Sequence, residues 1–423
     1  MSKKLINLLL LAALVLSLLP AVALAAPPEQ DKGKTHTLSQ AESLSALAQK
    51  LYNDPLAYHA IVYYTNLKAK EDSTLTKIDN PDLVAAGSVI YLPTDQEVKE
   101  FASGAKAGIT KVGLVTDVGK VNDGTFNQYA YEGMLKAAKE FNLKNAFIET
   151  QQPTDYEKNV KQFADEGYDF IVTVGFMMGD TTKKMAEAYP NIKFAIVDFA
   201  YDPPIPNVWG LVFREDQSGF LAGALAGLMT KSKTVGIVAG MEIPPVKKFR
   251  NGYQNGVKYV CPDCNVLGVY IDSFTDPARG KAAAESQIAE GADVIFGAGG
   301  PTGSGGILGA AQQGVWVIGV DQDEYYTTFK GGQEKGSDKL LSSAMKRVDT
   351  AVYNAIRAGY LGFFEGKTAV FDAASAGVGL APFHDTEGAV PAEVKAKLVE
   401  IATMLATGTL DTGVDPVTGD MKP

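Results

Sequence analysis

The chain has 423 residues, 46% of them hydrophobic, with a formal net charge of −10, enough for two or three folding units with substantial cores. The net acidic charge, with its basic residues scattered along the sequence, argues against a nucleic-acid partner. Only two cysteines and three histidines are present, so histidine-based catalysis and a complete zinc site have few residues to draw on.

The first 25 residues have the pattern of a secretory signal peptide. Lys3 and Lys4 precede an almost unbroken apolar run, which ends in the small-x-small cleavage pattern Ala23-Leu24-Ala25. We expect residues 1–25 to be removed, which changes the formal charge from −10 to −12, and the mature chain to be secreted, periplasmic or cell-wall associated. An uncleaved membrane anchor is the alternative. No cysteine lies near the cleavage point, so no lipid anchor is expected.

Residues 35–94 are predicted to form a small module with the order strand, helix, helix, strand. The apolar residues of "SLSALAQKLY" have helical spacing, and "NPDLVAAGSVIYLP" ends in a glycine turn and a short β run. Together these stretches resemble a LysM module, which implies a partner such as peptidoglycan or another glycan that contains N-acetylglucosamine. A spacer domain that binds no sugar is the alternative. The charged, small-residue stretch 95–110 is predicted to be a linker.

From residue 111 to the C-terminus, short apolar runs such as "KVGLVTD", "FIVTVG" and "VWVIGVD" alternate with glycine or polar loops and helical patterns. This alternation predicts an α/β fold with parallel sheets covered by helices on both faces. Ligands of such sheets bind beyond the carboxyl ends of the strands. The candidates at strand ends are Asp117, Phe176, Asp198, Gly299 and Asp321.

The loop "TDVGKVNDGTFNQ", residues 116–128, is the most informative of these strand ends. Its aspartates would repel a phosphate, and neither it nor the glycine cluster "GAGGPTGSGG" has the lysine and hydroxyl of a phosphate-binding loop. Asp117, Asn122 and Asp123 could ligate a metal, although their spacing is not that of a calcium loop. We therefore expect neither a cofactor nor a metal.

Catalysis finds little support in the sequence, since no GxSxG motif is present and the three histidines lie apart. A wall glycan hydrolase that uses a pair of carboxylates is the enzyme alternative. Capture of a polar, ring-bearing ligand is favoured, because Phe126 could stack on a ring and the adjacent Asn127 could fix its orientation. Alternatively, Phe126 belongs to the core of the following helix.

The same loop, with the pattern Asp-x-Gly-x-x-x-Asp-x-Thr-Phe-Asn-Gln, resembles the basic membrane protein family. Further matches follow in order, among them "YPNIKFAIVD", "VFREDQSGFLAGALAGLMTKSKTVGIVAGM", "KKFRNGYQNGVKYV" and "SFTDPARGKAAAESQIAEGADVIFGAGG". These relatives are extracytoplasmic proteins of ABC importers that bind purine nucleosides such as guanosine, inosine or adenosine. The resemblance implies an ABC transporter permease as partner and no chemistry. A sugar or other small polar ligand is the alternative.

The resemblance also implies a type I periplasmic-binding-protein fold, in which two doubly wound lobes joined by a hinge close on the ligand. Lobe 1 would comprise about 111–212 plus 321–360. Lobe 2 would comprise about 213–320 plus part of the C-terminal tail. "GFLAGALAGLMT" has glycines four residues apart, as in membrane helices, but it is too short to span a bilayer, so we expect a helix that packs closely on a sheet.

Residue by residue, the resemblance implies a set of ligand contacts. Phe126 and Phe249 would be aromatic walls that hold the purine, with Phe176 in reserve, and the side-chain oxygens of Asn127 and Asp198 would bind the base edge. Asp321 and Lys346 would form an ionised pair that binds the ribose hydroxyls. Asp117 and Gly299 would line the pocket floor.

Several of these residues also have structural interpretations. Asp198 and Asp321 could be helix caps or hinge residues, and Lys346 a surface charge. Lys120 and Pro301 depart from the family pattern.

The two cysteines, Cys261 and Cys264, form the motif "CPDC". In an exported chain a small structural disulfide is favoured, and thiol–disulfide catalysis, free thiols and metal-bound thiols are the alternatives. The missing lipid-anchor cysteine, together with the LysM-like module, suggests that this module retains the protein in the cell wall.

Overall fold

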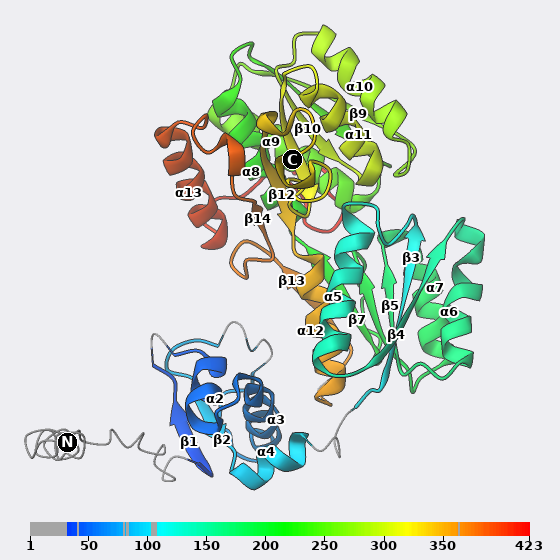
Figure 1. The fold of residues 1–423 in the computed structure, drawn as a ribbon, viewed down its shortest axis with the longest axis vertical. Coiled ribbons are helices and arrows are strands. Elements are labelled where there is room, and N and C mark those ends of the chain that lie inside the picture. The colour runs from blue at the N-terminus through cyan, green and yellow to red at the C-terminus, as the bar shows by residue number, and fades with distance from the viewer. Residues whose placement is uncertain (1–31, 40–41, 79–80, 82–83, 103–107, 363) are drawn as a thin grey trace, which may run out of the picture. The chain divides into compact units, whose positions relative to one another are not determined.

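The computed structural model describes residues 32–39, 42–78, 81, 84–102, 108–362 and 364–423. The expected signal peptide therefore lies outside the described residues. The chain divides into two compact units, Met1–Ala105 and Lys106–Pro423 (Figure 1).

In the N-terminal unit, β1 (Lys34–Thr37) pairs antiparallel with β2 (Val89–Leu92). Between them the chain forms α2 (Leu44–Tyr52), η2 (Pro55–Ala57) and α3 (Tyr58–Lys68). Helix α2 buries its apolar residues at the helical spacing seen in the sequence and is capped by the Ser43 hydroxyl. The order strand, helix, helix, strand agrees with the expected order. The assignment of this unit to LysM modules stays a prediction.

The first residues of the expected linker are not extended. Residues Asp95–Ala102 form helix α4, which belongs to the N-terminal unit. The Thr94 hydroxyl accepts from the backbone N–H of Glu97 (3.2 Å), and the Glu97 carboxylate accepts from the backbone N–H of Thr94 (2.7 Å). This reciprocal pair is a capping box, and its pattern, "TDQE", is visible in the sequence. The connection between the units is therefore shorter than predicted.

The first sheet of the larger unit has six strands, all parallel, in the order β13-β7-β6-β5-β3-β4. Helices α5 and α12 pack on one face and α6 and α7 on the other. The strands are β3 (Lys111–Val118), β4 (Lys144–Thr150), β5 (Phe170–Val174), β6 (Lys193–Val197), β7 (Val208–Phe213) and β13 (Lys367–Phe371). The helices are α5 (Phe126–Glu140), α6 (Tyr156–Asp165), α7 (Gly179–Ala188) and α12 (Val348–Tyr360).

The second sheet has the order β14-β12-β11-β10-β8-β9, and only its β12–β14 pair is antiparallel. Helices α8, α9 and α13 pack on one face, and α10 and α11 on the other. The strands are β8 (Thr234–Ala239), β9 (Asn265–Tyr270), β10 (Val294–Ala298), β11 (Trp316–Asp321), β12 (Leu340–Lys346) and β14 (Val378–Leu380). The helices are α8 (Glu215–Met229), α9 (Pro244–Val260), α10 (Pro277–Ala289), α11 (Gly300–Ala311) and α13 (Ala392–Ala406). The predicted α/β class with two parallel-sheet lobes is confirmed.

The lobe boundaries differ from the expected ones at the C-terminal side. Residues 321–360 were expected in lobe 1, but β12 pairs with β11 in the second sheet, and the chain returns to the first lobe only at α12 and β13. Strand β12 lies between β11 and β14 in that sheet, and the hydrophobic pattern alone does not specify this ladder of backbone hydrogen bonds. The chain crosses between the lobes at Arg214, at Arg347 and at residues 372–377. Backbone hydrogen bonds join these crossings, from Arg214 to Phe371 and from Arg347 to Gly377 (both 2.9 Å).

The glycine-rich helix α8 packs on the second sheet, as expected, and also closely against helix α9. A Cβ atom on Gly223 would lie 2.0 Å from the carbonyl oxygen of Tyr253 in α9, and a Cβ on Gly256 would lie 2.0 Å from that of Phe220. Glycines on both helices thus allow the two backbones to approach closely. Within the described residues, no helix combines the length and apolar character needed to cross a membrane.

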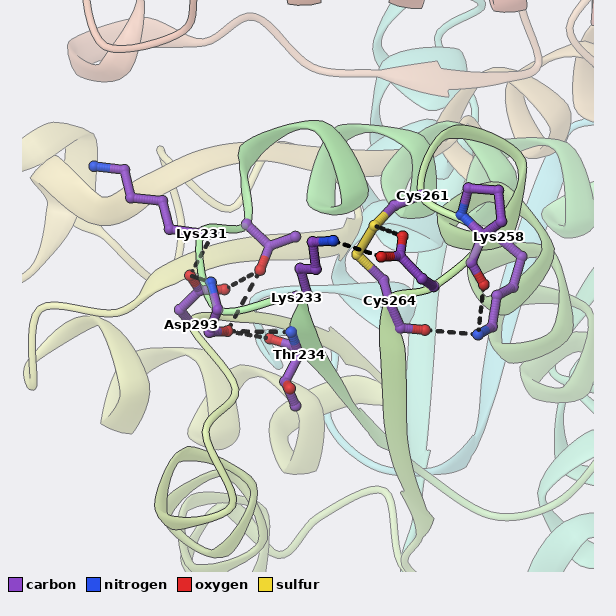
Figure 2. Close-up of a disulfide and its surroundings, with 11 residues drawn as sticks. Lys231, Lys233, Thr234, Lys258, Cys261, Cys264 and Asp293 are labelled. Atoms are coloured by element: carbon purple, nitrogen blue, oxygen red, sulfur yellow. Dashed lines mark hydrogen bonds and ion pairs between the residues drawn. A yellow bond between two sulfur atoms is a disulfide. The ribbon is translucent and has the colours of Figure 1, made fainter.

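A disulfide joins Cys261 and Cys264 immediately after α9 (Figure 2). The ammonium group of Lys258 donates to the carbonyl oxygen of Cys264 (2.6 Å), and Lys233 forms an ion pair with Asp263 in the same turn. These contacts connect the end of α9 to the starts of β8 and β9.

Candidate functional site

A cavity of about 400 Å³ lies between the two sheets and is lined by residues from both lobes. All eight ligand contacts that the sequence suggested, and the reserve residue Phe176, lie on its wall. They are Asp117, Phe126, Asn127, Asp198, Phe249, Gly299, Asp321 and Lys346. Lys120 and Pro301, where the sequence departs from the family pattern, line the same cavity. The topology explains the convergence, because the loops after parallel strands meet at one edge of each sheet.

Two of the aspartates have an unusual backbone conformation. Asp198 (φ +70°) follows β6 and Asp321 (φ +65°) ends β11, and both lie in the left-handed region that non-glycine residues seldom adopt. At Asp321 the backbone N–H of Gln322 donates to the carbonyl oxygen of Val320 (2.8 Å), as in a γ-turn. Strained conformations of this kind concentrate at functional sites.

The loop before α5 is organised by Asp123, which sequence reasoning considered only as a metal ligand. Its carboxylate accepts hydrogen bonds from the backbone N–H groups of Thr125 (2.9 Å), Asn127 (3.0 Å) and Gln128 (3.1 Å). Asp123 therefore caps the N-terminus of α5, whose unpaired N–H groups favour a carboxylate. Phe126 and Asn127 are the first two residues of the helix, and the cap places both on the cavity wall.

Asn127 is buried and offers an acceptor to the cavity. Its amide nitrogen donates to Asp123 (3.1 Å), whereas its oxygen Oδ1 is buried without a hydrogen-bond partner among the described residues. A buried unpaired acceptor is costly, so such an atom in a cavity wall is suited to a ligand donor.

Asp117 lies against the backbone of Gly175. A Cβ atom on Gly175, which has φ +114°, would lie 2.3 Å from the carboxylate oxygen Oδ2 of Asp117, so a side chain there would displace Asp117. Burial, followed by the nearby charges of Asp123 and Asp198, raises the pKa of Asp117 well above its usual range.

Lys346 lies at the centre of a buried ion network. Its ammonium nitrogen is 2.7 Å from Asp198 Oδ2 and 2.9 Å from Glu215 Oε1, and Glu215 also pairs with Lys248. Burial by itself would lower the pKa of Lys346, but the charges of Asp198 and Glu215 outweigh burial and raise it. The Lys346 ammonium also lies 4.9 Å from the ring centroid of Phe126.

This network changes the partner expected for Lys346. The sequence reasoning paired Lys346 with Asp321, but its ion pairs within the described structure are with Asp198 and Glu215. The hydrogen bond to Asp198 engages one ammonium proton of Lys346, and a remaining proton is available for a ligand. Asp198 Oδ1 is buried without a partner among the described residues, so it provides a further acceptor at the cavity.

Glu215 and Lys248 were not identified from the sequence, although they lie in the family-like stretches "VFREDQSG" and "KKFRNG". Glu215 is fully buried at the start of α8, directly after the first crossing between the lobes. The ammonium group of Lys248 also donates to the carbonyl oxygen of Phe213 (2.8 Å). Glu215 and Lys248 come together only when the lobes fold, so no local sequence pattern identifies their ion pair.

Asp321 faces the cavity without an ion-pair partner among the described residues. Burial raises its pKa to about 7; the charge of Lys346 acts in the opposite direction, and the charge of Asp198 adds to the increase. Asp321 can therefore act as a hydrogen-bond acceptor at neutral pH.

The apolar part of the cavity comes from both lobes. Phe126 and Phe176 contribute from the first lobe, and Phe249 and Phe274 from the second. Phe249 is largely buried in the second core, where its ring packs edge-on to Phe296 with centroids 6.1 Å apart. Phe274, in "SFTDPARG", was missed and is half-buried. Four rings around buried oxygen atoms can hold a flat ring that carries polar groups.

The backbone at the start of α11 completes the lining. Gly299 has φ +147°, and a Cβ atom there would lie 2.4 Å from the backbone nitrogen of Gly240. Glycine is therefore required where β10 turns into α11. The turn brings Gly300 and Pro301, the first residues of α11, to the cavity wall. Proline has no backbone N–H, and the N–H of Thr302 donates to Phe274, so the Gly300 N–H is the donor that could bind a ligand acceptor there.

Comparison with known proteins adds to this geometry. Residues 109–402 match the family model described as ABC transporter substrate-binding protein PnrA-like. The ABC transporter nucleoside-binding protein BmpA of Lactococcus lactis subsp. cremoris is 34% identical over 301 residues, which cover 68% of this chain and 86% of that protein. A CD4+ T-cell-stimulating antigen of Listeria monocytogenes is 31% identical over 315 residues, covering 71% and 87%.

The fold has a counterpart among solved structures. A solute-binding protein of an ABC transporter system from Aeropyrum pernix K1 superposes with a TM-score of 0.65 at 27% identity, covering 71% of this chain and 92% of that chain.

Proposed function

The chain belongs to the PnrA-like family of ABC transporter substrate-binding proteins, and from this premise we propose that it captures a purine nucleoside between its two lobes. Proteins of this family are extracytoplasmic and bind a small molecule for an ABC transporter. The observation that carries the nucleoside proposal is the pairing of the Phe126 ring with buried, unpaired oxygen atoms on Asn127 and Asp198 in one cavity. The name of the Lactococcus relative supports it.

In this proposal each group on the cavity wall has a role. Phe126 stacks on one face of the purine, and Phe249 or Phe176 closes the other. Asn127 and Asp198 accept hydrogen bonds from the base edge, where an analogue that lacks the matching donor would leave a buried acceptor unpaired.

Asp321 and a remaining ammonium proton of Lys346 would hold the ribose hydroxyls. Asp117 and Gly299 would line the floor of the site. Binding in this cavity, with delivery to a permease, involves no covalent step.

Calorimetric titration of the full chain tests the proposed ligand. Guanosine, inosine and adenosine are titrated at pH 7.5, and ribose is titrated under the same conditions. We expect at least one nucleoside to bind more tightly than ribose, because stacking contributes roughly 1–3 kcal/mol per base. Absence of nucleoside binding, or tighter binding of ribose than of guanosine, would overturn the proposal. Release of reducing sugar from peptidoglycan would favour the hydrolase alternative.

We further propose that the N-terminal unit retains the mature protein at the cell wall by binding an N-acetylglucosamine glycan, after removal of residues 1–25 as a signal peptide. The antiparallel pair β1–β2 with two intervening helices supports this role. Deletion of residues 35–94 should release the protein from the wall into the medium. Unchanged wall retention of the deletion variant would contradict the proposal.

A further inference from the structure

One turn of the first lobe is held directly by the second lobe. The hydroxyl of Thr327 donates to the carbonyl oxygen of Gly124 (2.7 Å), and the side-chain amide of Gln322 donates to the carbonyl oxygen of Thr125 (3.1 Å). Both acceptors precede α5 in the first lobe, whereas both donors follow β11 in the second lobe. A Cβ on Gly300, at the start of α11, would lie 3.9 Å from the Thr125 hydroxyl oxygen, so the second lobe approaches this turn from two sides.

The carbonyl groups are available because of how α5 begins. Gly124 precedes the N-cap residue Thr125, so its carbonyl lies outside the hydrogen-bond ladder of α5, and the backbone N–H of Gln128 donates to the Asp123 carboxylate (3.1 Å). The Gly124 oxygen is therefore left for Thr327. The Thr125 carbonyl accepts from Tyr129 within the helix (3.0 Å) and uses its second lone pair for Gln322.

Gln322 is also rigidly connected to the cavity. Gln322 directly follows Asp321 in the γ-turn. The conformation of this turn directs the Asp321 carboxylate to the cavity and the Gln322 amide to the first lobe. Gln322 is buried, and its hydrogen bond is therefore shielded from competition by water. The turn to which Gln322 is hydrogen-bonded leads directly into Phe126 and Asn127.

We propose that Gln322 and Thr327 form a closure latch, which holds the second lobe on the Gly124–Thr125 turn and sets how long a ligand stays in the cavity. The ligand part of this inference rests on the proposed function. Both bonds join protein groups only, so they need no ligand to form, and we expect the ligand-free protein to populate the closed arrangement. Gln322 and Thr327 are positioning residues for the aromatic and amide groups that face the ligand.

The test uses three threonine variants of the full chain. Thr327→Val removes the hydroxyl at nearly constant volume, and Thr327→Ser restores it. Thr328→Val is the matched control, because the Thr328 hydroxyl donates to Glu324 within its own lobe. Two quantities are measured: the guanosine dissociation rate, and the distance distribution between spin labels on exposed residues of the two lobes, at Glu187 and Glu290, without ligand.

For Thr327→Val we expect guanosine release to become about 2- to 12-fold faster, the range that corresponds to one hydrogen bond. The association rate should also rise, because more of the ligand-free variant is open. The label distances of this ligand-free variant should shift to longer values. Thr327→Ser should behave as the parent protein. Thr328→Val should lower the unfolding temperature and leave both the release rate and the label distances unchanged.

Unchanged label distances in Thr327→Val would overturn the latch, whether or not a nucleoside binds. An equal effect of Thr328→Val on release would show that lost stability, rather than a lobe contact, is responsible, and would also overturn it. If no nucleoside binds, the proposed function fails by itself, and the label distances still decide the latch. Gln322→Met, which removes the other donor, provides the same comparison if Thr327→Val does not fold.

Discussion

Replacing Asp321 by asparagine is expected to stabilise the ligand-free protein at pH 8 and to weaken ligand binding. Asp321 is buried in the cavity wall, and burial, opposed by Lys346 and reinforced by Asp198, raises its pKa to about 7. The folded protein thus disfavours a charge that the unfolded chain carries without penalty above pH 4. Asp321→Asn removes this charge and keeps the shape of the side chain.

The expected gain in stability follows from the difference between the pKa of Asp321 in the folded protein, about 7, and the ordinary value of 3.8. That difference corresponds to about 4 kcal/mol of stability lost at pH values well above 7. The buried amide of the variant would cost on the order of 1–2 kcal/mol if its hydrogen bonds are incomplete, which leaves a net gain of about 2–3 kcal/mol.

The stability difference between the parent protein and Asp321→Asn should change with pH only in a defined window. Because the folded-state pKa lies above the unfolded-state value, the folded protein retains a proton between about pH 4 and pH 7 that the unfolded chain has lost. The stability of the parent protein should therefore fall, relative to Asp321→Asn, as the pH rises through this window. The difference should be smallest near pH 4 and constant above pH 8.

Urea unfolding followed by fluorescence, from pH 4 to pH 8.5 without ligand, measures this difference. Calorimetry with guanosine at pH 8 measures the accompanying loss of affinity. A stability difference that does not change with pH, or a variant that is less stable than the parent at pH 8, would refute the reasoning. Either result would show that the Asp321 carboxylate is not disfavoured in the folded protein.

Glu324 provides a contrasting control with a similar pKa. Burial raises the pKa of Glu324 to about 7, but its carboxylate accepts hydrogen bonds from the Val320 backbone (3.0 Å), Ser304 (2.8 Å) and Thr328. Glu324→Gln also removes a charge that burial disfavours, and the Ser304 and Thr328 hydroxyls can rotate to accept from the new amide. Because these hydrogen bonds must rearrange, Glu324→Gln should gain less stability at pH 8 than Asp321→Asn.

Three further outcomes are expected. Phe126→Ala should weaken nucleoside binding by roughly 1–3 kcal/mol in calorimetry; a loss of folding stability as large as the loss of affinity would show that Phe126 is mainly a core residue. Glu215→Gln leaves two buried lysines to share one carboxylate and should lower the free energy of unfolding by about 3–5 kcal/mol in urea; a loss below about 1 kcal/mol, typical of exposed pairs, would contradict the buried network. Gly223→Ala should destabilise by about 1–3 kcal/mol because α8 and α9 must separate, whereas Gly379→Ala, with open space around it, should not.

The positions of most cavity residues could be predicted because they depend on local sequence. A short apolar run followed by a polar or glycine loop predicts a strand end, and parallel strands bring their carboxyl ends to one edge. Asp117, Asp198, Gly299 and Asp321 were found in this way and lie on one cavity wall. The helix after the loop was also expected, but it begins at Phe126, within the stretch 116–128 that was predicted to be a loop. The capping box before α4 was also present in the sequence but was read as part of a linker.

The partners of these residues could not be predicted in the same way. Lys346 and Asp198 are 148 positions apart, and Thr327 and Gly124 are 203 apart. Nothing in the local pattern of either residue specifies the other, because the pairing depends on where β12 and the crossing segments place the second lobe. For the same reason Lys346 was assigned to Asp321 rather than to Asp198 and Glu215.

The sequence by itself determined the α/β class and the set of side chains at strand ends, since periodicity and turn residues act over a few positions. The two-lobe fold was implied by the family resemblance. The tertiary structure decided which lobe β12 joins, which charges form ion pairs, and which turn of the first lobe is hydrogen-bonded to the second. Those features arise when distant segments are buried together, because only then does an unpaired charge or carbonyl group become costly enough to select its partner.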